Sequence, residues 1–102
     1  MELSKWSKSY KKFKMKNLEK GHEYYKENKV LNYRQLEDGV FEGKVSGSNS
    51  EVYIAKLNLK YFKQSTCNCP FGEEGNKCKH LAALYFTIYG DEWYEDYLNQ
   101  YY

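Results

Sequence analysis

All three cysteines of this 102-residue chain fall between positions 67 and 78, and a histidine follows at position 80. The spacing is C-x-C, eight residues, then C-x-H, formed by Cys67 with Cys69 and by Cys78 with His80. Thiolate sulfurs and imidazole nitrogens are the usual ligands of a closed tetrahedral zinc site. The motif therefore favours a fold in which two short segments meet at one metal ion.

The spacing also predicts the local structure on each side of the metal. Residues i and i+2 of a strand point to the same face, so Cys67 and Cys69 would both present their sulfurs from a strand. On a helix the same spacing places two side chains about 200° apart. We therefore expect Cys78 at or just before a helix start and His80 in the first turn. The positive end of the helix dipole would favour the thiolate form of Cys78.

Two other interpretations of the cysteines remain open, namely free buried thiols and a disulfide. A disulfide framework favours an even number of cysteines, whereas this chain has three. The mixed cysteine and histidine set favours zinc over iron.

The motif resembles the SWIM zinc finger, whose signature is C-x-C-x(n)-C-x-H in a strand-strand-helix arrangement. Further matching segments are Gly21-His22-Glu23-Tyr24-Tyr25, Lys29-Val30, Val45-Ser46-Gly47-Ser48 and Cys78-Lys79-His80-Leu81-Ala82-Ala83. The resemblance covers roughly residues 17–88. It implies that Cys67, Cys69, Cys78 and His80 hold Zn²⁺. It also implies a DNA or protein partner, since SWIM fingers accompany Snf-family helicase-type ATPases, Mutator-type transposases and recombination-associated proteins. This chain has no GKS or GKT phosphate loop, so we expect an accessory or stand-alone domain without the motor.

Hydrophobic periodicity predicts an α+β fold in a single domain spanning residues 1–102, with the zinc motif at 66–89 and a basic helical segment at 3–27. The predicted helices are 3–16, 18–27 capped by Asn17, 77–89, and 92–101 capped by Asp91. The predicted strands are 30–36, 40–45, 51–59 and 63–69, with a type I′ turn at Asp38-Gly39. Four strands joined by short loops predict an antiparallel meander, with the zinc joining its last strand to the following helix.

Composition bears on the cellular location of the protein and on whether it is an enzyme. No apolar run approaches the length of a membrane span, because the longest covers residues 81–89. Clustered cysteines without a secretory apolar segment suggest a reducing, intracellular and cytoplasmic setting. Four protein ligands leave no open position on the metal, so we expect no enzyme activity and no small-molecule substrate. His22 is expected to be a packing or surface residue.

Charge is distributed unevenly along the chain. Residues 1–29 have a net charge of +5, whereas residues 90–102 have −4. The basic N-terminal segment suggests three alternatives: contacts with nucleic-acid phosphates, a solvated helix docked through Trp6, Tyr10 and Phe13, or a position near the acidic C-terminal segment of the same domain. The candidate nucleic-acid contacts are Lys8, Lys11, Lys12, Lys77 and Lys79. The alternative function is a protein-interaction module that uses the aromatic C-terminal helix or a sheet face.

Overall fold

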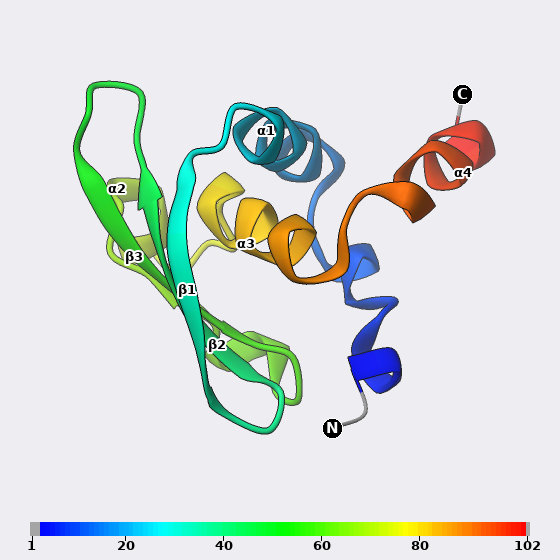
Figure 1. Ribbon diagram of the computed structural model, residues 1–102, viewed down its shortest axis with the longest axis horizontal. Helices are drawn as coiled ribbons and strands as arrows, with labels where there is room; N and C mark the ends of the chain where they lie inside the picture. The colour runs from blue at the N-terminus through cyan, green and yellow to red at the C-terminus, as the bar shows by residue number, and fades with distance from the viewer. Residues whose placement is uncertain (1–2, 102) are drawn as a thin grey trace.

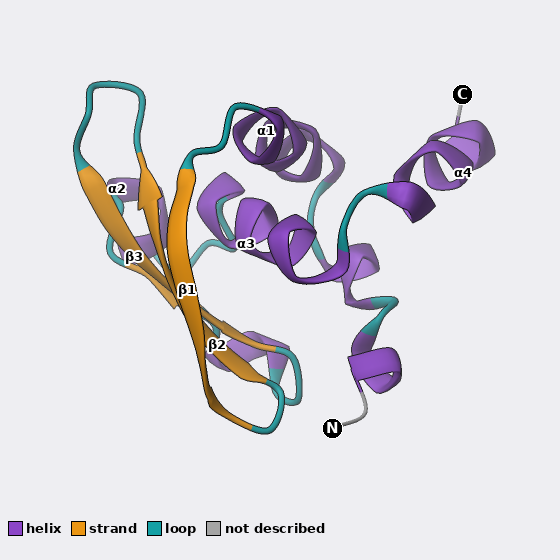
Figure 2. Ribbon diagram, in the orientation of Figure 1, coloured by secondary structure: helices purple, strands orange, loops and turns teal. Residues whose placement is uncertain are grey.

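The computed structural model describes residues 3–101, with side-chain detail for residues 5–99. In chain order the elements are η1 (Leu3–Trp6), η2 (Ser9–Lys12), α1 (Met15–Lys26), β1 (Val30–Glu37), β2 (Val40–Ser46), β3 (Val52–Asn58), η3 (Phe62–Gln64), β4 (Thr66–Cys67), α2 (Pro70–Glu73), α3 (Lys79–Tyr89) and α4 (Glu92–Tyr101), in which η denotes a 3-10 helix. The fold class is α+β, as predicted, because a four-stranded sheet occupies one side and helices α1, α3 and α4 lie on the other (Figures 1 and 2).

The sheet is an antiparallel meander in the order β1-β2-β3-β4, which confirms the predicted topology. The fourth strand is much shorter than the predicted 63–69, because it contains only Thr66 and Cys67. Residues 62–64 form a 3-10 turn that buries Phe62, and Pro70 starts the short helix α2. These two turns confine the pairing of β4 with β3 to two residues.

The β1–β2 hairpin does not have the predicted type I′ turn. That turn needs a positive φ at both central residues. Gly39 has a φ of 77°, but Asp38 is not among the described non-glycine residues with a positive φ. A register shift between Gln35 and Glu37 accommodates an extra residue in β1. The hairpin is therefore closed by a bulge, which adds to the twist of this edge strand.

Helix α3 is the centre of the core. Its residues from His80 to Phe86 are all buried, and the helix lies beside the sheet with α1 next to it (Figure 1). Sequence predicts this helix, which begins two residues later than expected and ends before Gly90. Since α3 is apolar on nearly every side, it needs cover beyond the sheet.

Helix α1 supplies one part of that cover by packing closely along α3. A Cβ atom added at Gly21 would lie 2.9 Å from the backbone nitrogen of Ala83 and 3.0 Å from the carbonyl carbon of Ala82. Glycine at this position therefore allows the two backbones to approach each other. Sequence analysis did not anticipate this contact.

Substitution of Gly21 tests the close approach of the two helices. Alanine favours a helix interior by about 1 kcal/mol over glycine. We nevertheless expect Gly21→Ala to lower the free energy of unfolding by about 1–3 kcal/mol, because the added methyl group forces the helices apart. Urea denaturation with excess zinc measures this change. Lys20→Ala, at the exposed neighbouring position, serves as the control and should change stability by less than about 0.5 kcal/mol. Equal stability of the two variants would contradict the packing.

The N-terminal segment differs from the single helix predicted for residues 3–16. It forms two 3-10 turns, and Phe13 is extended at φ −87° and ψ 147° before α1 begins at Met15. Trp6 lies against Gly39, whereas Phe13 contacts Phe62 with ring centroids 5.0 Å apart. These aromatic side chains dock at different places, so one straight helix could not satisfy both. The early start of α1 also means that Asn17 lies within the helix and does not cap it.

Helix α4 covers another side of α3 through an aromatic cluster formed by Tyr10, Phe86, Trp93, Tyr94 and Tyr97. Trp93 stacks on Phe86 with centroids 5.1 Å apart and on Tyr10 with centroids 4.3 Å apart. Tyr94 and Tyr97 are buried. The aromatic stripe of the predicted final helix therefore packs within the chain itself.

His22 lies in a polar contact between α1 and the turn that precedes α4. Its Nε2 atom is 3.1 Å from Oδ2 of Asp91. This hydrogen bond, with a smaller contribution from the charge of Lys26, holds the pKa of Asp91 below its ordinary value.

No helix within residues 3–101 combines the length and apolar composition that a membrane span requires.

Candidate metal centre

Each residue of the C-x-C and C-x-H motif is placed by the end of an element. Cys67 is the last residue of β4, and Cys69 precedes α2 in the N-cap position. Cys78 is the N-cap of α3, and His80 follows in the first turn of that helix. The predicted placement of Cys78 and His80 is therefore confirmed. Cys69 departs from the predicted strand because Pro70 is well suited to the first position of a helix.

The four side chains converge on one buried point. Their ligand atoms all lie within 4.8 Å of one another. Nδ1 of His80 is 3.7 Å from Sγ of Cys67 and 3.6 Å from Sγ of Cys78. A tetrahedron with ordinary zinc–sulfur and zinc–nitrogen bonds places sulfur and nitrogen about 3.6 Å apart. The cluster is thus close enough, and has the right donor atoms, to bind a zinc ion.

The three thiols have unequal proton affinities. The hydrogen bond from Cys67, assisted by His80 and by the backbone N–H of Leu81, lowers the pKa of Cys78 to about 4 despite burial. The same hydrogen bond and burial raise the pKa of Cys67 far above its ordinary value, and burial raises that of Cys69. Burial and the hydrogen bonds among these groups thus shift the thiol pKa values in opposite directions. A bound Zn²⁺ supplies the positive charge that allows all three to ionise.

Several neighbouring groups fix the loops that carry the cysteines. The backbone N–H of Gly72 donates to Sγ of Cys69 at 3.2 Å. The side chain of Asn68 accepts a hydrogen bond from the backbone N–H of Ile54 at 2.8 Å. These contacts connect the C-x-C loop to α2 and to β3. Sequence reasoning did not identify Asn68 as a positioning residue, although its place between the two cysteines was a signal.

The two lysines beside the C-x-H motif have partners within the chain. Nζ of Lys77 donates to the carbonyl oxygens of Lys63 at 3.0 Å and Ser65 at 2.7 Å. Nζ of Lys79 lies 5.0 Å from the ring centroid of Tyr24. The ammonium group of Lys77 therefore connects the segment before α3 to the segment before β4.

The other three predicted lysines lie at η2. Lys11 and Lys12 belong to this turn and Lys8 precedes it, and all three are exposed. Nζ of Lys12 is 5.7 Å from the ring centroid of Phe62. Lys8, Lys11 and Lys12 thus belong to the η2 segment, whereas Lys77 and Lys79 flank the start of α3.

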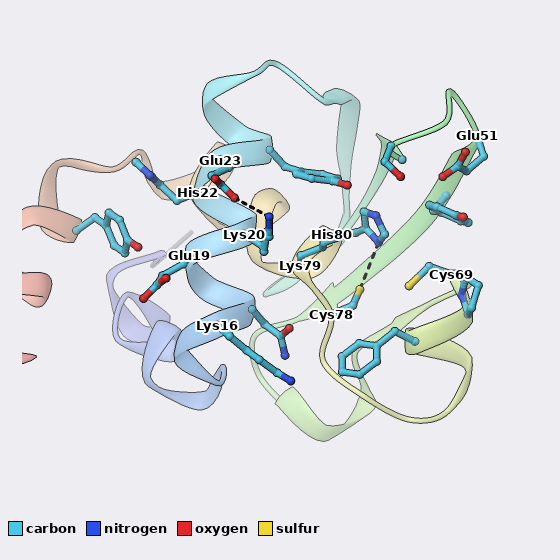
Figure 3. Close-up of a pocket in the computed structure, with 18 of the residues that line it drawn as sticks. Lys16, Glu19, Lys20, His22, Glu23, Glu51, Cys69, Cys78, Lys79 and His80 are labelled. Carbon is cyan, nitrogen blue, oxygen red and sulfur yellow. Dashed lines mark hydrogen bonds and ion pairs between the residues drawn. The ribbon is translucent and has the colours of Figure 1, made fainter.

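A groove of about 1060 Å³ adjoins the cluster, between α1 and the β2–β3 turn. Figure 3 shows Cys69, Cys78 and His80 on one side and the charged residues of α1 on the other. The charged side chains that line the groove are Lys16, Glu19, Lys20, Glu23, Glu51 and Lys79. Lysines and glutamates are equal in number there, so the groove does not favour a polyanion.

The ring of His80 is enclosed by aromatic side chains on the groove side. Tyr53 lies 4.9 Å away and Tyr24 lies 5.6 Å away between ring centroids. Nε2 of His80 is buried and has no hydrogen-bond partner among the described residues, whereas Nδ1 faces the sulfurs. This orientation leaves Nδ1 as the atom that can bind a metal.

Searches for similar proteins give one informative result. No curated protein and no solved structure matches the chain. The family model of the SWIM zinc finger matches residues 61–89, a segment that contains β4, α2, α3 and the entire cysteine–histidine cluster. Helices α1 and α4 and strands β1 to β3 lie outside the match. Residues 61–89 are therefore similar to the SWIM zinc finger, a zinc-binding module and not a catalytic domain.

Proposed function

We propose that the chain is a single structural zinc-binding domain, spanning residues 1–102. Zinc would be held by Sγ of Cys67, Cys69 and Cys78 and by Nδ1 of His80. The convergence of these four buried atoms within 4.8 Å carries the proposal. Zinc supplies folding free energy and neutralises the thiolates. By binding residues from both segments, zinc would fix the orientation of α3 relative to the short strand β4. A reducing intracellular compartment suits this site, because thiols persist there.

We further propose that the partner is nucleic acid and that the domain accompanies a helicase or recombination-type protein. The similarity of residues 61–89 to the SWIM zinc finger and the excess of lysine in residues 1–29 support this assignment. Lysines gain affinity for phosphates by releasing counterions, which is independent of sequence. The five lysines identified from the sequence at positions 8, 11, 12, 77 and 79 are candidates for such contacts.

A binding assay over a range of salt concentrations tests the nucleic-acid assignment. We expect the zinc-loaded chain to bind labelled oligonucleotides and to lose affinity linearly on a logarithmic salt scale, because phosphate contacts displace cations. Fluorescence anisotropy measures both quantities. Absence of binding at about 50 mM salt, where these contacts are strong, would reject a nucleic-acid partner.

The alternative function is a protein-interaction module, and the observation that favours it is the exposure of β1. All but the first residue of this strand are exposed, including Leu31, Tyr33 and Leu36. β1 is also an edge of the sheet, which leaves its outer backbone groups available for strand addition. The C-terminal helix is a poorer candidate, since Tyr94 and Tyr97 are buried. A chain that binds no oligonucleotide at low salt would favour this alternative.

A further inference from the structure

Two segments that are far apart in the sequence contain lysines but no acidic residue, and the first of them is rich in lysine. Residues 5–18 include Lys5, Lys8, Lys11, Lys12, Lys14 and Lys16, and residues 59–72 include Lys60 and Lys63. Neither segment contains Asp or Glu. Either stretch alone could be an ordinary solvated surface, so their relative position in the fold decides whether they act together.

Aromatic contacts hold these two segments side by side. Phe13 packs edge-on against Phe62 at 5.0 Å, and Nζ of Lys12 lies 5.7 Å from the same Phe62 ring. At the other end, a Cβ atom added at Gly39 would lie 3.1 Å from the ring of Trp6 and 3.5 Å from Cβ of Lys60. Trp6 and Lys60 thus meet over the β1–β2 turn. The η1–η2 segment and the η3 segment therefore form one continuous surface.

The lysines of this surface project their charge into solvent. Lys5, Lys8, Lys11, Lys12, Lys14, Lys60 and Lys63 are all exposed, and we call them the lysine surface. Within the described part of the chain, none of them forms an ion pair with a carboxylate. Acidic residues lie beside it at two places. Glu37 and Asp38 line a small cavity together with Lys60, and α4, which carries Glu92, Glu95 and Asp96, packs against Tyr10 of η2 through Trp93 and Tyr97. The seven lysines of the surface outnumber these five carboxylates, whereas lysines and glutamates are equal in number in the groove beside the metal cluster.

An exposed aromatic ring stands on the lysine surface. The side chain of Tyr61 is 57% exposed, and Nζ of Lys60 lies 5.7 Å from its ring centroid. The backbone N–H of Tyr61 donates to Oδ1 of Asn58 at 2.8 Å, which fixes the position of this residue. Because its backbone is fixed and its exposed ring is flanked by lysines, Tyr61 is suited to stacking on an unpaired base.

We propose that the lysine surface, together with Tyr61, binds single-stranded nucleic acid. This inference rests on the proposed nucleic-acid function and specifies the surface and the form of the ligand. Lysines follow the phosphates, and Tyr61 stacks on a base. The local elements are 3-10 turns of three or four residues, which cannot serve as a recognition helix in a duplex major groove. A base must also be unpaired before it can stack on the exposed ring of Tyr61, and the bases of a single strand are unpaired.

The experiment compares two triple variants with equal changes of charge. Lys12→Gln/Lys60→Gln/Lys63→Gln alters the lysine surface, and Lys26→Gln/Lys44→Gln/Lys56→Gln removes three exposed lysines elsewhere as the control. The probe is labelled oligothymidylate of about 15 nucleotides, with a hairpin duplex of the same length for comparison. We expect the surface variant to bind on the order of a hundredfold more weakly at about 50 mM salt, with a salt slope smaller by about 2. The control should bind like the wild type.

Tyr61 provides an independent test of base stacking. Tyr61→Ala should weaken oligothymidylate binding about tenfold, whereas Tyr61→Phe should retain affinity within about twofold because the ring is kept. All variants alter exposed side chains, and their circular dichroism, melting temperature and zinc content should match the wild type. Unchanged affinity of Tyr61→Ala, or tighter binding to the duplex than to the single strand, would overturn the single-strand assignment.

Different outcomes would reject the nucleic-acid function and the assignment of the lysine surface. If the wild type binds no oligonucleotide at low salt, the nucleic-acid function itself is rejected, and with it this surface. If the wild type binds but the control variant loses as much affinity as the surface variant, the function stands and the assignment of the lysine surface is wrong.

Discussion

Cys67→Ser and His80→Ala are each expected to lose stoichiometric zinc and to unfold the domain. Structural zinc contributes about 10–16 kcal/mol to the folding of zinc-finger peptides, which matches or exceeds the net stability of about 5–15 kcal/mol typical of a whole domain. The consequence should be large here because the site joins β4 to α3, and α3 is the centre of the core. Metal analysis gives the zinc content, and far-UV circular dichroism gives the helix content.

The control for the ligand variants is Thr66→Ala, an exposed position that precedes Cys67 in the same strand. It should retain zinc and lose less than about 0.5 kcal/mol. A strong chelator should unfold the wild type, and added zinc should restore it. A metal-free chain with an unchanged spectrum and melting temperature would contradict the structural role of the metal.

Phe86→Ala should lower the free energy of unfolding by about 3–5 kcal/mol even with zinc bound. Phe86 is fully buried in α3, and its ring contacts those of Trp93, Tyr94 and Tyr25. Truncation would leave a cavity where α1, α3 and α4 meet. Urea denaturation with excess zinc measures the loss separately from metal binding.

Two further substitutions make this measurement specific to the core. Phe86→Leu keeps most of the buried volume and should cost less than about 1.5 kcal/mol. Phe71→Ala removes the same ring from a side chain that is 39% exposed, so we expect a change within about 0.5 kcal/mol. If Phe86→Ala were no more destabilising than Phe71→Ala, the aromatic cluster would not support the position of α4.

Local sequence signals predicted the elements with clear periodicity. The predicted strand at 51–59 and the predicted helix at 77–89 are present as β3 and α3. The motif spacing correctly placed Cys78 at the start of that helix. These predictions succeed because strand and helix geometry relate residues that are two to four positions apart.

Predictions failed where distant contacts control the backbone. The aromatic spacing of Trp6, Tyr10 and Phe13 suggested one helix, yet the first and last of these rings dock against Gly39 and Phe62. The predicted fourth strand was too long because Phe62 is buried in a turn. Gly39 and Phe62 are distant in sequence from Trp6 and Phe13, so no local pattern predicts these two contacts.

The sequence by itself determined the α+β class, the order of the strands and the set of atoms available for zinc. Only the tertiary structure decided how close α1 approaches α3 at Gly21, which nitrogen of His80 faces the sulfurs, and which lysines share a surface. The physical reason is the range of the interactions concerned. Spacing along the chain fixes which side chains share an element, whereas packing between elements fixes which of them meet.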